Sequence, residues 1–119
     1  MVLGYIRTIN IDADILLKSE QLDRLKSVKC DEIVEEEVEK ISENIADRLS
    51  SRDILVIESL NVLGKMTGEN LQYIDKLLEK DVKINILDLG LIENRDSRAY
   101  ELLQIFHRYE KNCLRERLL

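Results

Sequence analysis

Asp53-Ile54-Leu55-Val56-Ile57 is the stretch of sequence that decides the fold, and it is the strongest strand pattern in the chain. Its four apolar residues follow one another without the alternation of a half-exposed strand. A continuous apolar run of this length is typical of a strand that is buried on both faces, as in a parallel sheet. The run therefore predicts a sheet that lies between two layers of helices.

The segments on either side of this strand alternate between strand and helix patterns. Residues 2–9 are rich in β-branched and aromatic side chains, and residues 82–89 largely alternate apolar with polar side chains. Asp12 or Asp14 can cap a helix, and apolar residues recur at helical spacing in 36–49. We expect strands at 2–9, 33–34, 53–57 and 82–89, a helix that contains 15–25, and helices at 36–49, 70–80 and 97–119.

This order of elements predicts an α/β fold. Right-handed crossovers would connect a doubly wound, mostly parallel sheet of four to five strands, flanked by helices in three layers. The 119 residues suit one domain, with residues 1–95 as its α/β body and residues 96–119 as a long C-terminal oligomerisation helix of the same domain. Sites in such folds form at the carboxyl ends of strands, here around 7–10, 59–65 and 88–90.

The composition excludes several classes of protein. The formal net charge of −6 has the wrong sign for a chain that binds nucleic acid with its whole surface. Cys30 and Cys113 stand far apart and His107 is the sole histidine, so we expect no metal site, no disulfide framework and no cofactor. The apolar runs are too short to cross a bilayer, and the first residues lack a signal-peptide pattern, so we expect a cytoplasmic protein without a membrane partner.

Two of the strand ends carry side chains that could bind an anion. Arg7 emerges near the end of an apolar strand, on the same side as Tyr5 and Ile9, because side chains alternate along a strand. A guanidinium in that place needs an anion or carboxylate nearby, and an ordinary salt bridge is the simplest solution. After the third strand, Gly64 permits a tight turn and Lys65 can reach an anion, although the pattern is not a phosphate-binding P-loop.

Three fragments, in the correct order and separation, resemble the resolvase/invertase family of serine recombinases. Gly4-Tyr5-Ile6-Arg7-Thr8 resembles the family's opening, G-Y-x-R-x-S, and Leu60-Asn61-Val62-Leu63-Gly64-Lys65 is similar to its L-D-R-L-G-R turn. Arg115-Glu116-Arg117 resembles the E-R-x signature at the end of the family's long helix. The resemblance implies that a serine hydroxyl attacks a DNA phosphodiester while arginines stabilise the charge that develops at phosphorus.

The residues that carry this chemistry in the family are largely replaced. Ile9 stands at the position of the serine nucleophile, and isoleucine has no nucleophilic atom. The aspartate of the turn appears as Asn61, the next arginine as Val62 and the last as Lys65, while acidic residues 35–39 occupy a shortened region where the family places a further arginine. We therefore expect no working catalytic residues, only a vestigial site that consists of Tyr5, Arg7, Asn61, Lys65 and Arg117.

The terminal helix has an apolar face that predicts a partner. At 1.5 Å per residue it would be roughly 35 Å long, which is longer than a domain of this size needs for its own packing. An apolar face that extends past its own domain favours contact with another helix, and the resemblance implies a dimer interface there. We expect this oligomer interface to contain Leu102, Leu103, Phe106, Tyr109 and Cys113.

A basic stripe lies roughly opposite this apolar face and contains Arg108, Lys111 and Arg115, together with Gln104. A solvated surface and a phosphate-binding surface both remain open for the stripe, and Arg117 either points at the strand-end site or a partner, or only complements the helix dipole. No helix-turn-helix DNA-binding module is expected in the sequence. The candidates for contact with DNA phosphate are Arg7, Lys65, Arg108, Lys111 and Arg115.

These observations together predict a resolvase/invertase-like recombinase domain that is catalytically inactive and acts through dimerisation, as a regulator or structural partner in DNA recombination. Its partner would be a second copy, in a dimer or tetramer, or an active recombinase, with DNA a weak partner. Two alternatives remain: an active strand-exchange domain that uses Ser59 or Thr8 as nucleophile, and a receiver-like or nucleotide-binding module. The latter is disfavoured because the first strand ends in Arg7 and Ile9 rather than in paired acidic residues.

Overall fold

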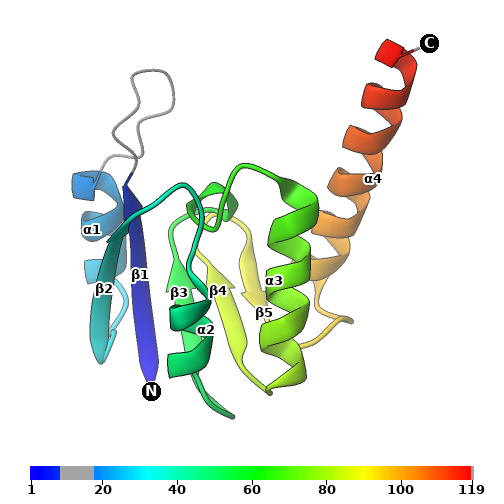
Figure 1. Cartoon of the computed structure of the whole chain (residues 1–119). Coiled ribbons are helices and arrows are strands. Elements are labelled where there is room, and N and C mark those ends of the chain that lie inside the picture. Colours follow the sequence, from blue (N-terminus) through cyan, green and yellow to red (C-terminus); the bar gives the residue numbers. More distant parts are fainter. Residues whose placement is uncertain (9–17, 119) are drawn as a thin grey trace.

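Five strands form one sheet in the order β2-β1-β3-β4-β5 (Figure 1). This computed structural model describes residues 1–8 and 18–118. The strands are β1 (Val2–Thr8), β2 (Glu32–Glu37), β3 (Ile54–Ile57), β4 (Lys83–Ile86) and β5 (Gly90–Ile92). The helices are α1 (Lys18–Lys26), α2 (Glu43–Arg48), α3 (Thr67–Glu79) and α4 (Arg98–Leu118), and a 3-10 turn, η1 (Leu60–Val62), follows β3.

The sheet is parallel except at one edge. β1 pairs in parallel with both β2 and β3, and β3 pairs in parallel with β4, whereas β5 is antiparallel to β4. Gly90 begins β5 with a φ of +137°, a conformation that side-chain-bearing residues rarely adopt, so the reversal after β4 depends on glycine. The carboxyl ends of β1, β3 and β4 therefore meet at the same edge of the sheet.

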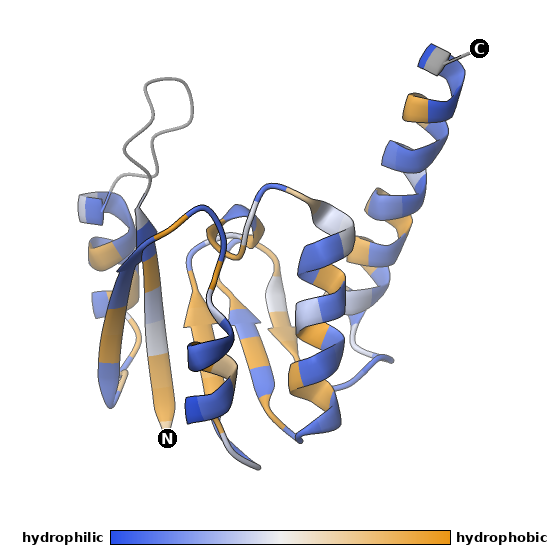
Figure 2. Cartoon of the chain, in the orientation of Figure 1, coloured by the Kyte–Doolittle hydropathy of each residue, from blue (hydrophilic) through white to orange (hydrophobic). Residues whose placement is uncertain are grey.

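Each face of the sheet has its own hydrophobic core. Leu55 and Ile57 of β3 belong to the larger core, which lies under α2, α3 and the start of α4. Val56 belongs instead to the smaller core and packs with Ile6 and Leu25 beneath α1. Figure 2 shows that the ribbon of β3 is hydrophobic. The expected burial of the 53–57 run on both faces is confirmed, because neighbouring residues of β3 enter different cores.

The acidic segment after the first helix was assigned wrongly from the sequence. We expected a strand of only residues 33–34 and a helix from residue 36, whereas β2 continues to Glu37 and α2 begins only at Glu43. Arg48 of α2 and Lys18 of α1 form ion pairs of 2.6 and 2.8 Å with carboxylates of β2. These tertiary contacts stabilise glutamates in an extended strand, which their intrinsic propensity disfavours.

Other boundaries differ by smaller amounts. The strand expected at 82–89 is shorter, because the chain turns back at Gly90 to form β5. The helix expected at 70–80 begins earlier, because α3 starts at Thr67 and includes Gly68 in its first turn. The candidate helix caps Asp12 and Asp14 lie outside the described residues.

α4 begins directly after Ser97 and leaves the body of the domain partway along its length. Tyr100 and Leu103 are each 4% exposed and belong to the larger core, whereas Tyr109 and Leu114 are 66% and 55% exposed. Figure 1 shows that the helix extends beyond the carboxyl ends of the strands. Neither α4 nor any other helix in the described part of the chain has the length and apolar character to cross a membrane.

Candidate functional site

Arg7 is the sole buried arginine or lysine among the described residues, at 1% exposed. Its Nε donates a hydrogen bond to the carbonyl oxygen of Val62 (2.7 Å), and its Nη2 donates to that of Asn61 (2.6 Å). Nη1 donates to the carbonyl oxygens of Val38 (3.1 Å) and Glu39 (2.6 Å). The expected anion or carboxylate partner is replaced by main-chain oxygens, so the guanidinium is not directed at a phosphate.

The main chain of Arg7 is fixed as firmly as its side chain. Its N–H donates to Oε1 of Gln21 (3.0 Å), and Nε2 of Gln21 donates back to its carbonyl oxygen (2.8 Å). Gln21 belongs to α1 and is 1% exposed. Burial lowers the pKa of the Arg7 guanidinium. The sequence pattern did not single out Gln21, because a glutamine in a polar helix gives no signal of such a contact.

Tyr5 is engaged within the protein in a similar way. Its hydroxyl donates a hydrogen bond of 2.6 Å to Oε1 of Glu36, and burial raises the pKa of this phenol well above its ordinary value. The Glu36 carboxylate also accepts hydrogen bonds from the Ser42 hydroxyl (2.6 Å) and the Ser42 N–H (3.2 Å). Although burial opposes ionisation, the hydrogen bonds from Ser42 and Tyr5 hold the pKa of Glu36 below its ordinary value.

Of the positions considered for a nucleophile, some lie within the described residues and others do not. Ile9, the residue at the serine position, lies outside the described residues, and so does Asn10. Thr8 ends β1 and is half-buried, and the Ser59 hydroxyl donates to Oδ1 of Asn61. Asn61 in η1 therefore contacts Arg7 of β1 with its carbonyl oxygen and Ser59 with its side chain.

A cleft of about 530 Å³ separates the loop before α3 from the distal half of α4. Lys65 and Arg117 both line it, so two of the five residues of the predicted site converge. Its other lining residues are Met66, Thr67, Tyr109, Glu110, Cys113 and Leu114. A neighbouring cleft of about 360 Å³ reaches Ser59 and Asn61 and shares Lys65 with the first. Tyr5 and Arg7 line neither cleft.

The residues expected at an oligomer interface fall into two sets. Leu103 is buried in the domain's own core and is not available to a partner. Leu102, Phe106 and Tyr109 are exposed by 38%, 48% and 66%, and Cys113 is half-buried. Ile105 is not among the residues expected at this interface and is also 51% exposed. The predicted face is therefore shifted around the helix, because the first turns of α4 use part of it for folding.

The basic stripe of α4 is open to solvent. Arg108, Lys111 and Arg115 are exposed, and none of them forms an ion pair with a residue that the structure describes. Within the same described ranges, no group of His, Cys, Asp and Glu side chains could hold a metal ion. The stripe is the sole group of predicted phosphate contacts that keeps its charges unpaired.

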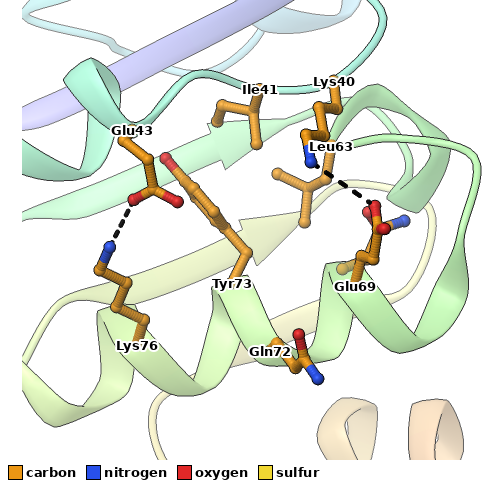
Figure 3. Close-up of a pocket in the computed structure, with 9 residues that line it drawn as sticks. Lys40, Ile41, Glu43, Leu63, Glu69, Gln72, Tyr73 and Lys76 are labelled. Carbon is orange, nitrogen blue, oxygen red and sulfur yellow. Dashed lines mark hydrogen bonds and ion pairs between the residues drawn. The ribbon is translucent and has the colours of Figure 1, made fainter.

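A further pocket, of about 330 Å³, lies between α2 and α3 (Figure 3). Ile41, Leu63 and Tyr73 contribute its apolar lining. Two ion pairs close its rim, one between Lys40 and Glu69 at 3.9 Å and the other between Lys76 and Glu43. These opposite charges satisfy one another, so the pocket is a weaker candidate for binding a charged ligand than the clefts beside α4.

Comparison with known proteins identifies the fold. No family model matches the chain, and neither does any curated protein sequence. The solved N-terminal catalytic domain of TP901-1 integrase is similar over 97% of this chain and 96% of its own, with a TM-score of 0.65 and 15% sequence identity. The chain therefore has a resolvase-like catalytic-domain fold, and the fold expected from the sequence is confirmed. At this identity the likeness concerns the fold, so chemistry has to be argued from the residues.

Proposed function

We propose that this chain is a recombinase-like domain that does not cleave DNA and that acts by associating through α4. The observation that carries the proposal is the exposed apolar surface of α4, formed by Leu102, Ile105, Phe106, Tyr109 and Leu114. Exposed apolar patches rimmed by polar residues commonly mark sites of protein–protein contact. The partner is a second copy or an active recombinase, and the role is that of a regulator or structural partner in recombination.

The hydrogen bonds of Arg7 support the absence of cleavage. A recombinase needs cationic donors directed at the reacting phosphate, and removal of one such donor typically costs about 100- to 1000-fold in rate. Here the donors of Arg7 end on carbonyl oxygens, and Val62 stands where the resemblance expects a further arginine. Isoleucine at position 9 removes the nucleophile as well.

The association is tested by sedimentation of two matched variants over a wide range of concentrations. Phe106→Asp places a carboxylate in the apolar surface, and Gln104→Asp makes the same change of charge at an exposed position of the same helix. We expect the wild type and Gln104→Asp to form a dimer or tetramer and Phe106→Asp to sediment as a monomer. A dimer of unchanged mass in Phe106→Asp would show that the assigned surface is wrong.

The alternative of an unusual nucleophile has its own test. A covalent adduct between the protein and DNA that disappears in Ser59→Ala or Thr8→Ala would show that cleavage survives. We expect no adduct, because the Ser59 hydroxyl is bound to Asn61 and no described base contacts it. The receiver-like alternative is not favoured by the antiparallel β5 or by an arginine at the end of β1.

A further inference from the structure

The two edges of the sheet differ in length. β5 forms one edge with three residues, and β2 forms the other with six. Among the described residues, β2 pairs with β1 alone, so the hydrogen-bonding groups on its outer side have no strand partner there. Short edge strands limit unwanted pairing, and a six-residue edge lacks that protection.

β2 is held in its extended conformation from both faces of the sheet. Glu32 forms an ion pair with Arg48 of α2, and on the opposite face Glu35 forms one with Lys18 of α1. Glu36 accepts the hydrogen bonds of Ser42 described above. These three carboxylates are therefore drawn toward the body of the domain. A strand that is ordered before binding loses less conformational entropy when a partner pairs with it.

The surroundings of this edge favour one kind of partner. Ile33 is 39% exposed and offers an apolar contact beside the edge. Glu37 and Glu39 are exposed and form no ion pair with a described residue. Like charges opposite one another destabilise paired strands, so the β2 strand of a second copy is disfavoured, whereas lysine or arginine is favoured.

We propose that the outer edge of β2 binds an extended, lysine- or arginine-bearing segment of a partner protein as a sixth strand. Main-chain hydrogen bonds supply the affinity, and Ile33 with the neighbouring glutamates supplies the selectivity for basic and apolar side chains. β2 lies at the opposite end of the strand order from β5, against which α4 packs. The edge can therefore be occupied while α4 makes its own contact.

The proposal is tested by amide NMR titration with three synthetic peptides. The first is acetyl-Thr-Lys-Val-Lys-Val-Lys-Val-Thr amide, the second has the same side chains with alternate main-chain nitrogens methylated, and the third has glutamate in place of lysine. We expect the first peptide to shift the β2 amides and protect them from exchange, and the other two to bind at least about tenfold more weakly. Equal binding of the methylated peptide would mean attraction by charge alone and would overturn the proposal.

A matched pair of variants locates the contact. Glu37→Lys reverses a charge beside the edge, and Glu101→Lys makes the same change on α4. We expect Glu37→Lys to weaken the first peptide by about threefold or more and Glu101→Lys to leave it unchanged. Equal effects of both variants on peptide binding would contradict the edge as a binding site. Protection of the outward-facing β2 amides from exchange in the absence of peptide would also contradict it. Sedimentation of the same variants reports separately on α4, so the two proposals fail independently.

Discussion

At Arg7, carbonyl oxygens from two separate loops accept the hydrogen bonds of one guanidinium. One loop precedes α2 and the other is η1, so the side chain joins segments that are more than twenty residues apart in sequence. Among residues 1–8 and 18–118, no carboxylate shares this contact. The group is thus a structural cross-link, made by a residue for which the sequence alone predicts a salt bridge or a contact with phosphate.

The contribution of this cross-link to stability can be measured by replacing Arg7. Arg7→Met keeps much of the side-chain volume but leaves buried carbonyls without donors, and each such group costs about 1–3 kcal/mol. We expect a loss of about 3 kcal/mol or more in the free energy of unfolding by urea denaturation, and a smaller loss for Arg7→Lys. Arg108→Met, on the exposed stripe, is the control and should change stability by about 0.5 kcal/mol at most. Equal stability of the Arg7 and Arg108 variants would refute the cross-link.

Glu36 gives the protein a sensitivity to acid. Its folded-state pKa is held below the ordinary value of 4.5, so the ionised form is favoured by folding. The resulting stability is present above pH 4.5 and is lost as the pH falls through the folded-state pKa. We expect Glu36→Gln to flatten the decrease in stability below pH 4.5, measured by urea denaturation at a series of pH values. An unchanged slope would assign the acid sensitivity to other carboxylates.

At the scale of elements, α3 and α4 meet at a glycine and a histidine. A Cβ atom on Gly68 would lie 3.0 Å from Cε1 of His107, closer than carbon atoms normally approach. Nδ1 of His107 is buried and has no hydrogen-bond partner in the described part of the chain. The imidazole therefore packs against α3, and it has room there because residue 68 is glycine.

A double-mutant cycle tests this contact. Alanine in place of a helical glycine stabilises by up to about 1 kcal/mol through backbone entropy, but Gly68→Ala also forces the His107 ring to move. We expect Gly68→Ala to stabilise the protein fully only together with His107→Ala, with a coupling free energy of at least about 0.5 kcal/mol. Additive changes in thermal unfolding would show that the two helices do not touch at this point.

The elements differ in how far their sequences predict them. β3 could be predicted because both of its faces are apolar, a pattern that neither a helix nor a loop of this length explains as well. Only residues 33–34 of β2 were predicted, because four of its six residues are glutamates and its stability comes from partners distant in sequence, such as Arg48. Leu103 shows the same limit on α4: a helical wheel marks the residue as apolar but not whether its own domain covers it.

The meeting of the strand ends was predictable, but the bonding of the residues there was not. The strand ends and the turn after β3 were correctly expected to meet, since parallel strands bring their carboxyl ends to one edge. The bonding of Arg7 to carbonyl oxygens was not predictable, because main-chain acceptors leave no trace in the residue types. Gln21 was missed for the same reason, since both of its bonds to Arg7 involve main-chain atoms of the arginine.

At the scale of the whole molecule, the net negative charge limits the affinity of the protein for DNA. The net charge is −6, and the unpaired cations of the α4 stripe are Arg108, Lys111 and Arg115. Each phosphate contact contributes about −0.9 to the slope of log affinity against log salt, so this stripe supports a slope no steeper than about −3. We expect the binding of duplex DNA, measured by fluorescence anisotropy, to be weak at low salt and to vanish near physiological salt. A variant in which Arg108, Lys111 and Arg115 are all replaced by glutamine should not bind. A steeper slope would require a second basic surface.

The bonds of Arg7 to carbonyl oxygens also bear on how such a chain can change over evolutionary time. A carbonyl oxygen is present whatever residue stands at positions 38, 39, 61 and 62. The bonds of Arg7 place no demand on the side chains there, so valine and asparagine can stand where the resemblance expects arginine and aspartate while these bonds are kept. The contact that holds the two loops together is therefore independent of the residue types at these four positions.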